Sequence, residues 1–89
     1  MRGCINLGLM YRDGDGVQQD YTQASVLFAR ACDGGHMQGC NNLGAMYLMG
    51  TGMEANHPRA FELFQRACDG GAPLGCTNYD RMQQEGFGQ

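Results

Sequence analysis

The sequence repeats itself with a period of 36 residues, and this period constrains the fold more than any other feature of the chain. A shift of 36 residues brings eighteen identical residues into register. In the first unit these are Gly3, Cys4, Asn6, Leu7, Gly8, Met10, Tyr11, Gly14, Gly16, Ala24, Leu27, Phe28 and the run 30–35. We therefore divide a single domain of residues 1–89 into a repeat at 3–38, a repeat at 39–74 and a partial capping repeat at 75–89.

Each full repeat is expected to form two helices joined by a tight turn. Small and apolar residues recur at the 3.6-residue period of a helix in the first half of the second repeat, at Cys40, Leu43, Gly44 and Tyr47. The second half of the first repeat has the same spacing, at Ala24, Leu27, Phe28, Ala31 and Cys32. Asp20 and Asn56 are the expected N-caps of the second helices, and Gly14 with Gly16 permits the turn. The predicted fold is all-α, an α/α superhelical solenoid of helix-turn-helix repeats.

Glycines in the middle of the first helices predict close helix packing. Gly8 and Gly44 each cost about 1 kcal/mol relative to alanine in a helix interior. We expect compensation from contacts with small residues of a neighbouring helix, namely Ala24, Ala31, Ala60 and Ala67. The partial repeat has Asp80 at this position, which is typical of a polar end of a solenoid. The first repeat starts without such a cap, so we expect the natural protein to extend upstream of residue 1.

The cysteines recur in pairs eight residues apart, each pair running from the end of a second helix into the next first helix. A disulfide Cys32–Cys40 and a disulfide Cys68–Cys76 would clamp the corners between repeats, each stabilising the fold by about 2.5 kcal/mol. The fifth cysteine, Cys4, would then need a partner upstream. Reduced structural thiols and a zinc site remain as alternatives, although two helix-packing distances separate the pairs by about 16–20 Å, too far for one metal ion.

The composition argues against several classes of partner. The chain has six arginines, nine acidic residues and no lysine, and its formal net charge is −3. The chain thus lacks the basic patch that neutralises the phosphates of nucleic acids. No apolar run approaches the roughly 20 residues of a membrane-spanning helix. We expect no nucleic-acid partner, no membrane span, no bound metal and no cofactor.

The segment GCNNLGAMYLMGTGMEANHPRAFELFQRACDGG resembles the Sel1-like repeat, a helical hairpin related to the TPR. The motifs LG-x-M-Y, G-x-G, A-x-x-x-F and A-C-D-G-G occur in order, and the resemblance covers nearly the whole chain. The paired cysteines are similar to those of the cysteine-rich Sel1-like proteins of Helicobacter and its relatives, and of a mitochondrial intermembrane-space assembly factor. The resemblance implies a right-handed superhelix, disulfides between adjacent repeats and a scaffold that binds a protein or peptide.

Some cysteine-rich Sel1-like proteins have been classed as penicillin-binding proteins or β-lactamases, so the resemblance also implies an enzymatic alternative. The serine β-lactamase motif S-x-x-K requires a lysine, and Ser25 is the single serine of this lysine-free chain. A nucleotide-binding loop requires a lysine as well. We therefore expect no enzyme and no catalytic residue, with a weak β-lactamase or penicillin-binding protein as the alternative.

An asparagine recurs beside the apolar stripe of each first helix, at Asn6, Asn42 and Asn78. The resemblance to TPR folds implies that this helix lines a concave groove, where the matching asparagine contacts bound peptide tails. An amide both donates and accepts hydrogen bonds, and Arg12 or Arg81 would add positive charge for a carboxylate. We expect these five residues to form a peptide groove. The alternative is that the asparagines bond to the backbone of neighbouring helices and hold the repeats in register.

The expected location follows from the five cysteines, which favour the periplasm or secretion. The segment MRGCINLG lacks the apolar stretch of a secretory signal. The mitochondrial intermembrane space and the cytoplasm therefore remain alternatives.

Overall fold

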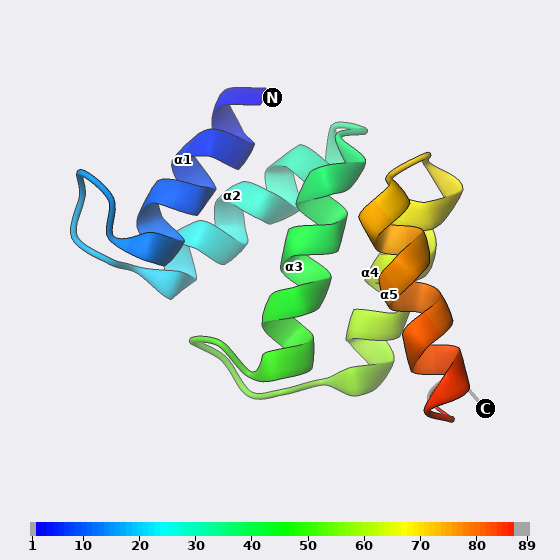
Figure 1. Ribbon diagram of the computed structural model, residues 1–89. Coiled ribbons are helices and arrows are strands. Elements are labelled where there is room, and N and C mark those ends of the chain that lie inside the picture. Colours follow the sequence, from blue (N-terminus) through cyan, green and yellow to red (C-terminus); the bar gives the residue numbers. More distant parts are fainter. Residues whose placement is uncertain (1, 87–89) are drawn as a thin grey trace.

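The computed structural model describes residues 2–86, which form five helices and no strand, stacked as successive hairpins (Figure 1). The helices are α1 (Arg2–Asp13), α2 (Tyr21–Asp33), α3 (Met37–Met49), α4 (His57–Asp69) and α5 (Pro73–Gln84). Each helix packs against the next one along the chain, and α5 also contacts α3. The predicted all-α solenoid is confirmed.

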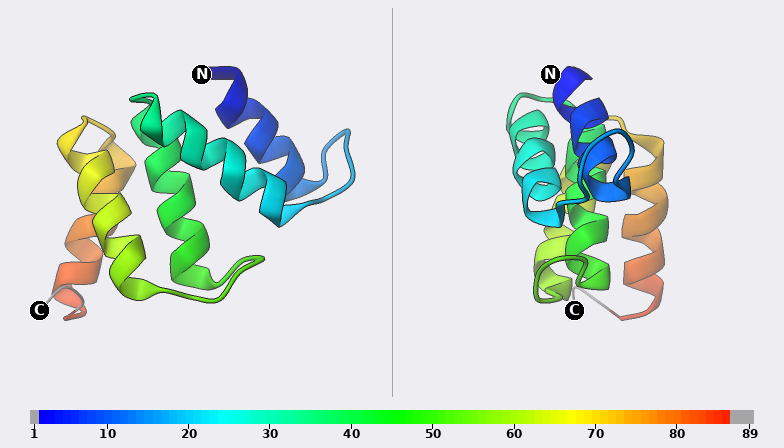
Figure 2. Two further views of the ribbon diagram at one scale, coloured as in Figure 1. Left: turned by 180° about the vertical axis from the view of Figure 1, so that it is seen from behind. Right: turned by 90° about the vertical axis from the view of Figure 1, so that its left-hand side faces the viewer.

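The hairpins stack into a flat array measuring 39 × 25 × 16 Å. The right-hand view of Figure 2 shows α2 on one side of the array and α1 and α5 on the other. We call the surface formed by α1, α3 and α5 the first-helix face. In Figure 1 this face is turned toward the reader, with α2 and α4 behind it.

The second helices begin at the predicted caps. Asp20 Oδ1 accepts a hydrogen bond from the backbone N–H of Gln23 at 3.1 Å, and Asn56 Oδ1 accepts one from that of Arg59 at 3.1 Å. The turn after α3 begins at Gly50, whose φ of 68° is left-handed and therefore favours glycine. Both N-cap predictions are confirmed.

The core follows the predicted stripe of the second helices closely. In α2 the buried residues are Ala24, Leu27, Phe28, Ala31 and Cys32. The first helices follow their predicted stripe less closely, because Tyr47 of α3 is only half-buried whereas Met46 is 3% exposed. Asn41 is also buried, since α3 has neighbours in α2, α4 and α5 and so buries more than one stripe.

The mid-helix glycines permit close packing, and the atoms nearest to them belong to phenylalanine rings rather than to the predicted alanines. A Cβ on Gly8 would lie 2.7 Å from the ring of Phe28, and one on Gly44 would lie 2.8 Å from the ring of Phe64. Glycine is therefore needed because an aromatic ring of the second helix lies against the backbone of the first. Ala31 lies at the corner between repeats. A Cβ added to Gly39 would lie 2.8 Å from the Cβ of Ala31.

Candidate functional site

Two disulfides join the repeats at their corners. Cys32 of α2 bonds to Cys40 of α3, and Cys68 of α4 bonds to Cys76 of α5. The two Cα atoms of the pair are 4.6 Å apart in the first disulfide and 4.3 Å apart in the second. Each bond therefore holds the end of one helix against the start of the next. The predicted pairing is confirmed, and these four sulfur atoms are neither free thiols nor thiolate ligands. Cys4 is a free thiol, half-buried on α1.

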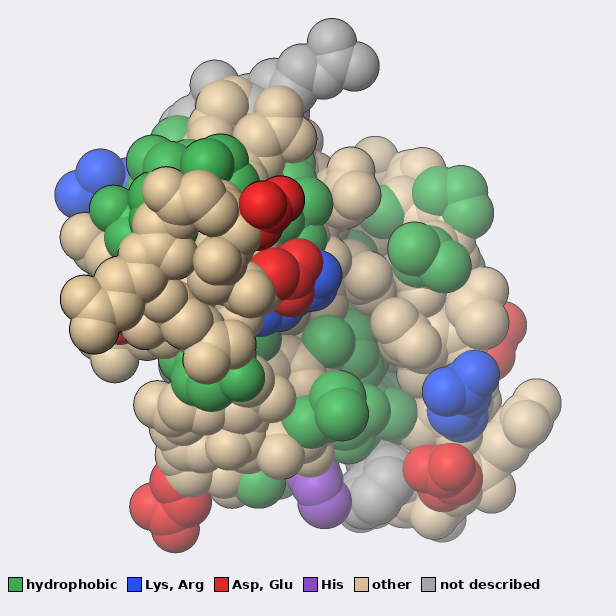
Figure 3. Space-filling model, turned by 60° about the vertical axis from the view of Figure 1, so that its left-hand side comes forward, with side chains coloured by type: hydrophobic (Ala, Val, Ile, Leu, Met, Phe, Trp, Pro, Cys, Tyr) green, Lys and Arg blue, Asp and Glu red, His purple; other side chains and the backbone are tan. Residues whose placement is uncertain are grey.

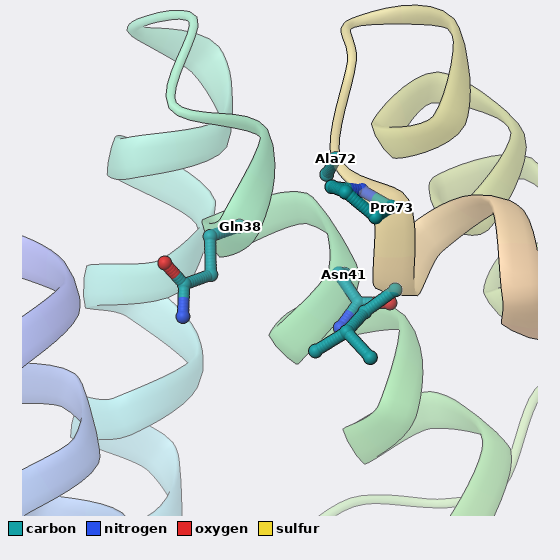
Figure 4. Close-up of a pocket in the computed structure, with 5 residues that line it drawn as sticks. Gln38, Asn41, Ala72 and Pro73 are labelled. Carbon is teal, nitrogen blue, oxygen red and sulfur yellow. The ribbon is translucent and has the colours of Figure 1, made fainter.

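Two hollows open on the first-helix face. The α1–α3 hollow has a volume of about 90 Å³ and is lined by Arg12, Asn42, Ala45, Met46, Met49 and Thr51. The α3–α5 pocket has a volume of about 390 Å³ and is lined by Gln38, Asn41, Ala72, Pro73 and Leu74 (Figure 4). Both are formed by the first helices and the residues next to them. Figure 3 looks at the molecule from the side of α1 and shows hydrophobic side chains exposed where its surface is hollowed.

The three predicted asparagines lie in different surroundings. Asn6 is exposed on α1 and lines neither hollow. Asn42 lines the α1–α3 hollow, and its Nδ2 atom is buried without a hydrogen-bond partner among residues 2–86. Asn78 donates from Nδ2 to Oδ1 of Asn41 at 2.8 Å, which joins α5 to α3. Asn78 thus bonds between repeats, as in the alternative interpretation, but to a side chain rather than to the backbone of the neighbouring helix.

The two predicted arginines are also placed differently. Arg12 lines the α1–α3 hollow, but its Nε donates to Asp13 Oδ1 at 2.9 Å. This hydrogen bond lowers the pKa of Asp13 and raises the pKa of Arg12. The charge of Arg12 is therefore balanced by its neighbour. Arg81 is exposed in the last turn of α5 and lines neither hollow.

The residues that line the larger pocket were not predicted from the sequence. Asn41 is 5% exposed, and the repeat positions that match it are Ile5 and Thr77, so the amide occurs in one repeat alone. Leu74, 62% exposed, takes the place of Gln38 in the next repeat. The signal that could have identified this pocket is the departure of these residues from the repeat pattern.

Two further observations concern the enzymatic alternative and the membrane span. Ser25 lies on α2, outside both hollows, and its hydroxyl donates to the carbonyl of Thr22 at 2.8 Å. In the described part of the chain, each helix is too short or too polar to cross a lipid bilayer.

Comparisons with solved structures identify the architecture. A protective antigen of uropathogenic Escherichia coli that displays an SLR fold is 33% identical, with a TM-score of 0.91, over 96% of this chain and 18% of that protein. Cysteine-rich protein B of Helicobacter pylori is 32% identical, with a TM-score of 0.80, over 85% of this chain and 57% of that one. A Sel1 repeat protein from Oxalobacter formigenes is 23% identical, with a TM-score of 0.87, over 98% of this chain and 36% of that one.

The chain therefore spans less than two thirds of each of these proteins. No curated protein matches it significantly. The disulfides and the cysteine-rich Helicobacter neighbour indicate an oxidising environment. A model of the Sel1 repeat matches residues 2–36 and 38–71, and with these two repeats the chain belongs to the Sel1 repeat family.

Proposed function

We propose that this repeat array is a scaffold that binds an extended segment of a partner protein along the first-helix face. The observation that carries the proposal is a stripe of residues on one side of α3, which we call the α3 stripe: Gln38, Asn41, Asn42, Ala45 and Met49. Gln38, Asn42, Ala45 and Met49 are spaced by three or four residues and so lie on one helix face, and Asn41 lies beside them, three residues after Gln38. The stripe begins in the α3–α5 pocket and ends in the α1–α3 hollow, so it connects the two.

The length of the stripe suits a short peptide. Gln38 and Met49 are eleven residues apart, which corresponds to about 16 Å along the helix. About five residues of extended chain cover that distance. A segment of this length could reach from one hollow to the other and contact both.

The chemistry of the stripe also supports peptide binding. Met49 is 77% exposed, and methionine adapts its shape to varied apolar side chains. Asn42 carries an amide nitrogen without a partner among the described residues, beside this methionine in the α1–α3 hollow. Apolar contact together with a few amide groups is the combination by which a surface binds both the side chains and the backbone of a peptide.

A selection from a random heptapeptide library on the unreduced protein tests the proposal, with affinities measured by fluorescence anisotropy. Met49→Glu should weaken binding of the selected peptides by about tenfold or more, because it places a charge where an apolar contact forms. Val26→Glu is the matched control, since Val26 is 40% exposed on α2, on the opposite layer. Failure to select any peptide, or an equal loss of affinity in both variants, would refute the proposal.

The proposed role of Asn42 has a separate test. Asn42→Ala should weaken peptide binding without lowering the melting temperature, because Nδ2 makes no hydrogen bond to the described protein. A lower melting temperature with unchanged affinity would assign Asn42 to the fold instead. Hydrolysis of a chromogenic cephalosporin above the level of a denatured control would favour the β-lactamase alternative over the scaffold.

We further infer that the protein works in the periplasm or outside the cell. The two disulfides support this location, because such bonds persist in oxidising compartments. Titration of the purified, unreduced protein should find one free thiol, that of Cys4. Five free thiols in protein isolated under thiol-trapping conditions would contradict the inference.

A further inference from the structure

One methionine of the α1–α3 hollow differs from the other methionines in its exposure. Met49 is the last residue of α3 and is 77% exposed. Met46, which lines the same hollow, is 3% exposed, and Met82 of α5 is 1% exposed. The remaining methionines within residues 2–86 are half-buried, namely Met10, Met37 and Met53. A dissolved oxidant therefore reaches the side chain of Met49 more readily than any other methionine in the described part of the chain.

The position of Met49 is acidic in the other two repeats. Its counterparts are Asp13, the last residue of α1, and Glu85, the residue after α5. Both acidic residues are exposed. The repeat therefore accommodates a polar side chain at this position. A polar group on Met49 would change the surface of the hollow and leave the packing of the helices intact.

Asn42 supplies a donor for such a polar group. Its Nδ2 atom is buried and has no hydrogen-bond partner among residues 2–86. Asn42 and Met49 are seven residues apart, which is two turns of α3, and both line the hollow of about 90 Å³. A thioether sulfur is only a weak acceptor. A strong acceptor on the Met49 side chain would satisfy this buried donor, which otherwise costs stability.

The cysteine sulfurs are separate from this place. Cys40, the half-cystine of α3, is nine residues before Met49, or about 13 Å along the helix. The free thiol of Cys4 is half-buried on α1 and lines neither hollow. Oxidation of Met49 therefore neither needs nor disturbs the disulfides that brace the repeats.

We propose that Met49 is a site of oxidation by hydrogen peroxide, and that the resulting methionine sulfoxide closes the α1–α3 hollow to peptides. The thioether sulfur attacks one oxygen of the peroxide, so that an S–O bond forms while the O–O bond breaks. The sulfur loses two electrons and the peroxide gains them. The second oxygen leaves as hydroxide, takes the proton of the transferred hydroxyl group and becomes water. The sulfoxide oxygen then accepts a hydrogen bond from Asn42 Nδ2.

The modification removes both features by which this end of the α3 stripe contacts a peptide. The sulfoxide replaces an adaptable apolar side chain with a polar one. It also occupies the amide of Asn42. The oxidised protein should therefore bind selected peptides about tenfold more weakly or less. This loss of affinity rests on the proposed function, whereas the oxidation of Met49 and its bond to Asn42 do not.

Treatment of the unreduced protein with hydrogen peroxide, followed by digestion and tandem mass spectrometry, tests the site. Met49 should be oxidised about tenfold or more faster than Met46 and Met82, because the buried side chains react only after the structure opens. In ¹⁵N-labelled protein the side-chain amide signal of Asn42 should shift on oxidation. The same signal should stay in place in peroxide-treated Met49→Leu, which has no sulfur at this position. Oxidation of Met46 as fast as that of Met49, or an Asn42 amide that does not shift, would overturn the proposal.

Peptide affinity before and after peroxide treatment tests the consequence, with each protein compared with itself. The parent protein should lose about tenfold in affinity, whereas the affinity of Met49→Leu should change by less than about twofold. The melting temperature of the parent should not fall on oxidation, since the repeat accommodates acidic residues at this position. An equal loss of affinity in Met49→Leu, or a lower melting temperature of the oxidised parent, would assign the effect to another residue or to the fold.

The modification and the proposed function can fail separately. If Met49 is oxidised selectively and the Asn42 amide shifts but no peptide is selected, the scaffold proposal is wrong and the oxidation site with its bond to Asn42 holds. If selected peptides bind equally well to the reduced and the oxidised protein, the proposed closure of the hollow is wrong and the scaffold proposal holds.

Discussion

Replacing Cys32 and Cys40 by alanine should lower the free energy of unfolding by about 4 kcal/mol. The disulfide joins residues eight apart, and opening such a loop costs about 2.5 kcal/mol in the chain-entropy model. Both side chains lie in the hydrophobic core, 1% and 0% exposed. Loss of each buried sulfur removes packing worth roughly that of a methylene group, about 0.8 kcal/mol.

The second disulfide is the matched control. Cys68 and Cys76 are also eight residues apart, so the entropy contribution is the same, but both side chains are only half-buried. Their double alanine variant should lose closer to about 2.5 kcal/mol. A domain of this size has a total stability of only about 4–13 kcal/mol, so both losses are large.

Urea unfolding followed by far-ultraviolet circular dichroism, without reductant, measures both losses. The variant lacking Cys32–Cys40 should also melt about 15–30 °C below the parent protein. A loss below about 1 kcal/mol in both variants would refute bracing by the disulfides. A larger loss from the Cys68–Cys76 pair would refute the packing contribution of the buried sulfurs.

Two further predictions follow from the helix packing and from the charged pair. Gly44→Ala should lower the melting temperature, because the added Cβ would lie 2.8 Å from the ring of Phe64. Overpacking costs about 1–3 kcal/mol, which outweighs the gain of about 1 kcal/mol in helix propensity. Gly3→Ala, with nothing within 4 Å of its Cβ, should raise the melting temperature instead, and a similar shift in both variants would contradict this packing. The hydrogen bond from Arg12 lowers the pKa of Asp13 in the folded protein. Any stabilisation by this pair is therefore present when the pH is above the pKa of Asp13 in the unfolded chain. It is lost as the pH falls through the pKa of Asp13 in the folded protein. Carboxyl titration by NMR should show a higher Asp13 pKa in Arg12→Ala, and an unchanged value would mean that Arg12 is not the cause.

Much of the fold could be predicted because the repeat presents the same constraints twice. The cysteine pairs, the caps Asp20 and Asn56 and the buried stripe of the second helices depend on spacing along the chain, which a sequence displays directly. The partners of Gly8 and Gly44 depend on which side chain the neighbouring helix turns toward them. That property arises from packing in three dimensions, and the spacing alone did not reveal the phenylalanine rings.

The candidate site was predicted less completely, because residues at one repeat position do not share one environment. Asn6, Asn42 and Asn78 share a repeat position but not an environment, since the first helices have different neighbours. Asn41 and Leu74 differ from their counterparts in other repeats, and both line the larger pocket. In this array the residues that depart from the consensus form the larger pocket, and the consensus mainly builds the scaffold.

The positions of the disulfides make α1 the least anchored of the described helices. Helices α2, α3, α4 and α5 each carry one half-cystine, whereas Cys4 of α1 is unpaired and α1 packs mainly against α2. Its amide hydrogens should therefore exchange with solvent earliest, through openings that leave the cross-linked helices intact. Because Arg12 of α1 lines the α1–α3 hollow together with residues of α3, an occupant that contacts both helices would slow hydrogen exchange along α1.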